Sequence, residues 1–207
     1  MTFCFRRAAC VWIAIGTVLL SGVCAQDEVR EAHKQSYRYE QSQNYKDAIN
    51  ALLVLKEKGY LEKLRLGWLY YLSGNFANSR ENYQAAIAAA PKAVEPRLGY
   101  LYPLLAQARY AEVETVAKQI LALDPDNYYG SMRLAFALRL QAKHDAALAV
   151  TERMLSLYPT DVGYLLEHGL NQTALKQSTV AKQTFEKVLN LDPENVIAKQ
   201  QLSAGGK

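Results

Sequence analysis

Four prolines recur at a constant interval, and this interval constrains the fold more than any other feature of the chain. Pro91, Pro125, Pro159 and Pro193 follow one another in steps of 34 residues. A short segment rich in leucine or alanine precedes each of them, which predicts a helix that ends before a residue unable to continue it. A fixed period of this length indicates stacked copies of one supersecondary unit, in which neighbouring copies complete each other's core.

The clearest unit contains, in order, Leu66, Gly67, Tyr70, a turn over residues 73–76, Ser79, Tyr83, Ala86 and Pro91. This spacing resembles the tetratricopeptide repeat, in which two antiparallel helices approach closely at small residues and aromatic side chains fill the space beside them. The chain departs from the family pattern at Lys63, where tryptophan is usual, and at Ser79, where alanine is usual.

The third unit departs further from the pattern. Pro96 and Pro103 both fall in its first helix, and its Leu98-Gly99 pair is displaced by two residues. We therefore expect that this helix either starts late and is kinked at Pro103, or has a local shift of register.

The resemblance implies an all-α fold, a right-handed α-solenoid of about five helical hairpins with a C-terminal capping helix. The repeat domain is expected over residues 26–207, with units at approximately 29–59, 60–93, 94–127, 128–161 and 162–195 and a cap at 194–204. This organisation takes up nearly the whole of that region and leaves no room for a separate catalytic domain.

Residues 1–25 have the order of a secretory signal peptide. Arg6 and Arg7 precede an uncharged stretch over residues 8–20, and small residues then lead to Ala25, where cleavage is expected. The protein is therefore predicted to be periplasmic or secreted. Membrane association is expected only if the segment is retained as an anchor or if Cys24 is lipidated.

Composition argues against several kinds of chemistry. All three cysteines lie in the predicted signal peptide, so the mature chain would have neither a disulfide nor a thiolate metal site. Removal of that segment leaves 22 basic and 20 acidic residues, a net charge of +2, which does not favour nucleic acid as a partner. The three histidines have no metal-ligand spacing, and no phosphate-binding loop or nucleophile elbow is present. We expect no enzyme activity, cofactor or metal.

The candidate binding residues lie on the first helix of each hairpin, on the side away from its partner helix. In arrays of the resembled family this side lines a concave groove. Spacings of i, i+4 and i+7 place aromatic and apolar residues of each unit on one stripe, with arginines among and beside them. The predicted groove residues are Tyr37, Leu64, Arg65, Trp68, Tyr71, Tyr102, Met132, Arg133, Phe136 and Arg139.

These features lead to a hypothesis and two alternatives. The hypothesis is a non-catalytic adaptor of the bacterial cell envelope that binds a polypeptide, such as a component of an envelope or secretion complex, in its groove. Aromatic faces also stack on sugars, so a glycan-binding or small-molecule-binding subunit of a polysaccharide export system is the first alternative. A structural module that associates with copies of itself is the second.

Overall fold

The computed structural model describes the backbone of residues 10–204 and the side chains of residues 26–204. The predicted signal peptide, residues 1–25, lies outside the described residues except for the helical backbone of residues 10–25. In the part of the chain that the structure describes, no helix combines the length and the apolar character needed to cross a membrane.

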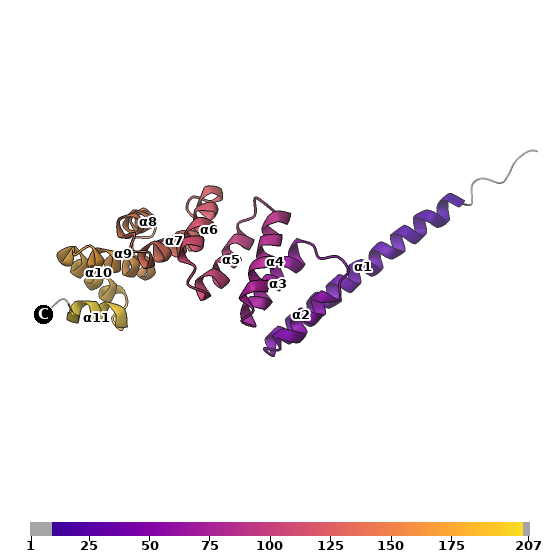
Figure 1. Ribbon diagram of the computed structural model, residues 1–207, viewed down its shortest axis with the longest axis horizontal. Helices are drawn as coiled ribbons and strands as arrows, with labels where there is room; N and C mark the ends of the chain where they lie inside the picture. The colour runs from indigo at the N-terminus through magenta and orange to yellow at the C-terminus, as the bar shows by residue number, and fades with distance from the viewer. Residues whose placement is uncertain (1–9, 205–207) are drawn as a thin grey trace, which may run out of the picture.

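The described chain is all-helical, as predicted, and its helices follow one another along an extended array in the order of the sequence (Figure 1). They are α1 (Cys10–Gln41), α2 (Tyr45–Leu53), α3 (Tyr60–Leu72), α4 (Phe76–Ala89), α5 (Glu95–Ala106), α6 (Tyr110–Leu123), α7 (Tyr128–Leu140), α8 (His144–Leu157), α9 (Val162–Ala174), α10 (Ser178–Leu191) and α11 (Val196–Ala204).

Each helix packs against the next helix in the chain, and some odd-numbered helices also contact each other. The additional contacts join α3 to α5, α5 to α7 and α7 to α9. The first helices of successive hairpins are therefore neighbours, whereas the second helices are not paired in this way. Side chains from α1, α3 and α5 can consequently meet on one face of the array.

The turn inside each hairpin uses the same backbone conformation. One residue per turn has a positive φ, and these residues are Gln43, Gly74, Ala108, Ala142 and Lys176, with φ of 59°, 77°, 53°, 57° and 60°. A left-handed conformation is strained for a residue with a Cβ and free of strain for glycine. The array therefore imposes this conformation even where the sequence supplies alanine, glutamine or lysine.

Side chains of complementary size separate the two helices of a hairpin. Gly67 and Gly169 stand against the rings of Tyr83 and Phe185, where an added Cβ would lie 2.9 Å and 2.8 Å from the ring atoms. At the equivalent positions of the third unit, the large residue Leu101 is on the first helix and the small residue Ala117 is on the second. In the third unit the bulky residue of the pair is thus on the first helix instead of the second.

Helix α5 accommodates both of its prolines. It begins at Glu95, one residue after the position equivalent to the start of α3, with Pro96 in the first turn and Pro103 inside the helix. A proline in the first turn removes no helical hydrogen bond. The displaced Gly99 stands against the Tyr83 ring, where an added Cβ would lie 2.6 Å from Cζ. The helix thus starts late but ends in step with α3, without a shift of register, and the glycine in the third unit makes space for an aromatic ring of the second.

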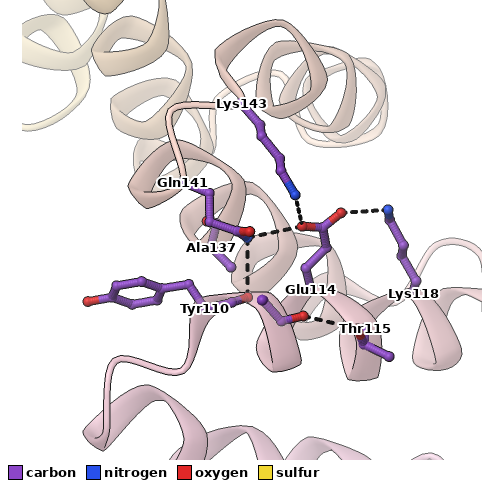
Figure 2. A network of polar contacts seen from close by, with 8 residues as sticks. Tyr110, Glu114, Thr115, Lys118, Ala137, Gln141 and Lys143 are labelled. Atoms are coloured by element: carbon purple, nitrogen blue, oxygen red, sulfur yellow. Dashed lines mark hydrogen bonds and ion pairs between the residues drawn. The ribbon is translucent and has the colours of Figure 1, made fainter.

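A polar network joins α6 to the turn between α7 and α8 (Figure 2). Glu114 accepts hydrogen bonds from Lys118 and Lys143, both at 2.7 Å, and from Gln141 at 3.0 Å. Gln141 also donates to the backbone carbonyls of Tyr110 and Ala137. The bonds from Lys118 and Lys143 lower the pKa of Glu114 to about 2, against the opposing effect of burial.

Candidate functional site

A cavity of about 480 Å³ opens between α1, α3 and α5. It is lined by His33, Tyr37, Leu61, Leu64, Arg65, Trp68, Tyr83, Glu95, Leu98, Gly99 and Tyr102. Five of the predicted groove residues are in this set, namely Tyr37, Leu64, Arg65, Trp68 and Tyr102. The structure therefore brings together side chains from three successive hairpins at a single hollow.

Aromatic rings form one wall of the cavity. The Trp68 ring lies 5.7 Å from the Tyr102 ring in an edge-to-face arrangement and 5.6 Å from the Tyr71 ring. Tyr71 also lies 5.3 Å from Tyr102 and 6.0 Å from Phe76, which begins α4. Tyr102 is 39% exposed, so the cluster presents aromatic surface to solvent while its other rings are partly buried.

The wall between α1 and α3 is polar. Glu40 accepts the indole N–H of Trp68 at 2.7 Å, and its second oxygen lies 2.8 Å from Nη2 of Arg65, an ion pair without the angle of a hydrogen bond. Nε of Arg65 donates to Ser36 at 3.1 Å, and the guanidinium carbon lies 3.4 Å from the ring centre of Tyr37. Arg65 is therefore buried and paired within the protein, and its charge is not free for a ligand.

A second polar contact joins α1 to the start of α3. Nε2 of His33 lies 2.8 Å from Glu62, whose other carboxylate oxygen accepts the backbone N–H of Gly59 at 2.8 Å, at the start of α3. Burial opposes ionisation of Glu62, but the hydrogen bond to His33 and the backbone N–H groups of Glu62 and Gly59 hold its pKa below its ordinary value. The carboxylate thus caps α3 and joins it to α1.

Tyr83 of α4 forms the floor of the cavity. Its side chain is 2% exposed, and burial raises its pKa well above the ordinary range of a phenol, with smaller contributions from Tyr102, Glu95 and Tyr71. Among the described residues its hydroxyl has no hydrogen-bond partner, although its ring is held firmly between glycines. A neutral hydroxyl therefore lies at the base of a largely aromatic hollow.

The remaining predicted groove residues on α7 lie outside this cavity. An added Cβ on Gly163 would lie 3.1 Å from Cε of Met132, and the Phe136 ring packs edge-on to Tyr110 at 6.3 Å. Arg139 donates two hydrogen bonds to Glu167, at 2.7 and 3.0 Å. These side chains are engaged in contacts between hairpins.

Tyr71 and Arg133 also lie outside the lining of the cavity. Tyr71 contacts the cavity wall through Trp68 and Tyr102 without lining the cavity itself. Arg133 is partly buried on α7, and among the described residues it takes part in no ion pair.

Sequence reasoning did not select Glu40 or Tyr83 as site residues. Glu40 lies on the predicted stripe, but its importance depends on the indole and guanidinium that α3 brings to it. The signal that was available is the spacing of His33, Ser36 and Glu40, which places three polar side chains on one face of α1. Tyr83 reads as an ordinary core residue, because its contact with the cavity depends on the displaced Gly99.

The site has no feature of a metal centre. Within the described residues, no three side chains of histidine, cysteine, aspartate or glutamate are grouped so that they could hold a metal ion.

Comparisons with known proteins agree with this architecture. The family model described as "Tetratricopeptide repeat" matches residues 63–92 and 163–195. A solved tetratricopeptide repeat protein from Parabacteroides merdae superposes with a TM-score of 0.79 at 12% identity, covering 86% of this chain and 72% of that one. The chain is a tetratricopeptide repeat protein. The predicted all-helical solenoid is thereby confirmed.

Two further similarities concern the fold and a single segment of the sequence. A solved structure of MamA superposes with a TM-score of 0.73 at 16% identity, covering 82% of this chain and 94% of MamA. The human protein O-mannosyl-transferase TMTC3 is 32% identical over 92 residues, which is 44% of this chain but only 10% of that protein's length.

The first segment matched by the repeat model, residues 63–92, contains α4 and most of α3. Leu64, Arg65, Trp68 and Tyr83, which line the cavity, all lie in this segment. The candidate site is therefore built on a recognisable tetratricopeptide repeat, and the third hairpin adds Leu98, Gly99 and Tyr102.

Proposed function

We propose that this tetratricopeptide repeat protein is an interaction scaffold that binds a segment of a partner polypeptide in the cavity between α1, α3 and α5. The observation that carries the proposal is the cluster of Trp68, Tyr71 and Tyr102 at a hollow of about 480 Å³. Aromatic side chains around a concave site are the usual anchors of protein–protein contacts. Repeat solenoids of this kind commonly use their extended concave surfaces for binding.

The charges around the cavity favour an uncharged segment of the partner. Arg65 is paired with Glu40, and Glu62 is hydrogen-bonded to His33 and to the backbone N–H of Gly59, so these groups have their partners inside the wall. Glu95 at the rim accepts a hydrogen bond from Tyr60 at 3.1 Å. A partner would therefore gain most from apolar and aromatic contacts, with hydrogen bonds to side chains at the edge.

The proposed setting is the bacterial cell envelope. Its support is the sequence of residues 1–25, where Arg6 and Arg7 precede an apolar stretch and a cleavage motif that ends at Ala25. Mass spectrometry of the purified protein tests this part of the proposal. A first residue of Gln26 supports export with cleavage, whereas an intact N-terminus on a protein recovered from the cytoplasm would overturn it.

A site-specific photo-cross-linker tests the groove. Tyr102, which is 39% exposed, is replaced by a photoreactive phenylalanine derivative, and Tyr158, which is 42% exposed at the end of α8, is replaced in the matched control. We expect a discrete cross-linked polypeptide from position 102 and not from position 158. The cross-linked segment is then synthesised and titrated against the purified protein.

The titration decides between the classes of ligand. Binding of the synthetic segment that weakens at least tenfold in Trp68→Ala supports the proposal. Undiminished binding to Trp68→Ala would overturn it. Saturable binding of soluble oligosaccharides at the same site, with no peptide binding, would assign the protein to the glycan-binding class instead. Cross-links only between copies of this chain would assign it to self-association.

A further inference from the structure

The floor of the cavity is unusually rigid. The Tyr83 ring lies between Gly67 of α3 and Gly99 of α5, and an added Cβ on Gly99 would be 2.9 Å from the Tyr83 hydroxyl oxygen. A ring wedged between two helices in this way cannot swing to another rotamer without moving a helix. The position of the hydroxyl, beside Gly99 at the cavity, is therefore fixed by the fold.

The hydroxyl of Tyr83 is also unusual in having no protein partner. Tyr164 of α9 is equally buried, and its hydroxyl donates to the backbone carbonyl of Tyr128 at 2.6 Å. Among the described residues the Tyr83 hydroxyl makes no such hydrogen bond, and its oxygen is not one of the enclosed atoms without a partner there, which are Nη2 of Arg65 and Nε of Arg97. The hydroxyl of Tyr83, a residue that lines the cavity, is therefore open to solvent, where a ligand can replace the water that bonds to it.

The walls above this hydroxyl are suited to a flat ring. Trp68 and Tyr102 pack edge to face on each other, with ring centres 5.7 Å apart, and together form one aromatic wall, to which Leu64 and Leu98 add apolar surface. A phenol is neutral at physiological pH, and burial raises the pKa of Tyr83 further, so its hydroxyl can both donate and accept a hydrogen bond. The phenol of a ligand tyrosine could likewise donate and accept a hydrogen bond, and its ring is flat and apolar.

We propose that the cavity is a specificity pocket for a tyrosine side chain of the bound polypeptide, whose phenol exchanges a hydrogen bond with the hydroxyl of Tyr83. This inference rests on the proposed function, and it adds the chemistry by which the site selects its ligand. The rings of Trp68 and Tyr102 contact the faces and edges of the inserted ring. Phenylalanine would fill the same space but leave the Tyr83 hydroxyl unpaired.

The test uses amino-acid amides as probes and Trp68 as reporter. The full chain carries Trp12→Phe, so that Trp68 is its only tryptophan and gives a single indole N–H resonance by nuclear magnetic resonance. N-acetyl-tyrosinamide and N-acetyl-phenylalaninamide are titrated separately. We expect the tyrosine probe to shift this resonance with a Kd roughly tenfold lower than that of the phenylalanine probe, as one neutral hydrogen bond provides.

Tyr83→Phe should abolish this preference. The Kd of the tyrosine probe should rise roughly tenfold, to that of the phenylalanine probe, while the latter stays unchanged. Tyr164→Phe is the matched control, because it removes a buried hydroxyl far from the cavity and should leave the preference intact. Tyr102→Ala, at an exposed position, should weaken both probes without altering their ratio.

Two outcomes would overturn the inference. The first is an unchanged preference for the tyrosine probe in Tyr83→Phe, and the second is the absence of any saturable shift of the Trp68 resonance with either probe. Failure of the proposed function is seen separately, in the cross-linking experiment. A cross-linked partner segment without tyrosine at the pocket would overturn this inference and leave the scaffold function standing.

Discussion

Glu40 of α1 accepts the indole N–H of Trp68 of α3 at 2.7 Å, and its other oxygen pairs with the buried guanidinium of Arg65. One carboxylate thus orients the largest aromatic side chain of the candidate site and neutralises the cation beside it. The first hairpin thus contributes to the cavity through this contact as well as through His33 and Tyr37, which line it.

Replacement of Glu40 should therefore lower the free energy of unfolding, and by more when both the Trp68 indole and the Arg65 guanidinium lose their contact with it. Glu40→Gln retains an acceptor for Trp68 but removes the charge that pairs with Arg65, and it should lower the free energy of unfolding by about 1 kcal/mol. Glu40→Ala removes both contacts and should cost about 2 kcal/mol. Urea denaturation followed by Trp68 fluorescence in a Trp12→Phe background measures both.

Glu31→Ala is the control for this pair of variants. Glu31 lies on the same helix, but its side chain is 54% exposed and its ion pair with Lys34 spans 3.4 Å. Its replacement should change the free energy of unfolding by less than about 0.5 kcal/mol. Equal effects of Glu31→Ala and Glu40→Ala would show that the Glu40 contacts contribute nothing beyond helix propensity.

Loss of the hydroxyl should lower the free energy of unfolding at Tyr164 but not at Tyr83. Tyr164→Phe removes a hydrogen bond to a backbone carbonyl and should cost about 1 kcal/mol, whereas Tyr83→Phe removes a hydroxyl that makes no hydrogen bond within the described residues and should be nearly neutral. Thermal and urea unfolding of the two variants measure the difference. A loss of stability in Tyr83→Phe as large as that in Tyr164→Phe would show that the Tyr83 hydroxyl has a partner in the folded protein.

The sequence was sufficient to predict the helices and the solenoid, because both follow from the 34-residue step and from apolar spacing within each step. It was also sufficient to place Trp68 and Tyr102 on the same face of successive hairpins. It could not show that Arg65 is paired internally, because that depends on the approach of α1 to α3.

The role of Tyr83 was hidden for a different reason. Helix α5 keeps the 34-residue step, since α3, α5 and α7 end at Leu72, Ala106 and Leu140, so Gly99 takes the position that Arg65 and Arg133 hold in the neighbouring units. The missing side chain leaves room there for the Tyr83 ring. Such a contact depends on the departure from the repeat, and a periodic pattern contains no information about where its own exceptions meet.

The turns inside the hairpins offer a further prediction. Ala142 has a φ of 57°, which strains a residue with a Cβ, so Ala142→Gly should raise the free energy of unfolding by about 0.5 to 1 kcal/mol. Gly74→Ala, at a φ of 77°, should lower it by about 1 kcal/mol. Chemical denaturation provides the values.

The control for the turn variants is Ala149→Gly, at an exposed position inside α8. Glycine there should cost about 1 kcal/mol, as it does in helix interiors generally. The same substitution is thus expected to have opposite signs seven residues apart. If Ala142→Gly were as destabilising as Ala149→Gly, the positive φ would not be a source of strain.

Ionisation of Glu114 should make the free energy of unfolding depend on pH in the acidic range. The pKa of its carboxyl is about 2 in the folded protein, because Lys118 and Lys143 donate to it, and about 4.3 in an unfolded chain. A lowered folded-state pKa gives stability that is fully present above the unfolded value and is lost as pH falls from about 5 to about 2. Because the two lysines are 61% and 49% exposed, screening reduces this contribution to about 1 kcal/mol.

Glu114→Gln should accordingly be less stable than the parent at pH 7 by about 1 kcal/mol, with the difference disappearing near pH 2. Urea unfolding at a series of pH values follows this convergence. Glu194→Gln is the control, since Glu194 pairs with Lys199 at 2.8 Å but its side chain is 90% exposed, and its loss should cost little at pH 7. A deficit in Glu114→Gln that persisted undiminished at pH 2 would mean that lost packing, rather than the charge of Glu114, accounts for it.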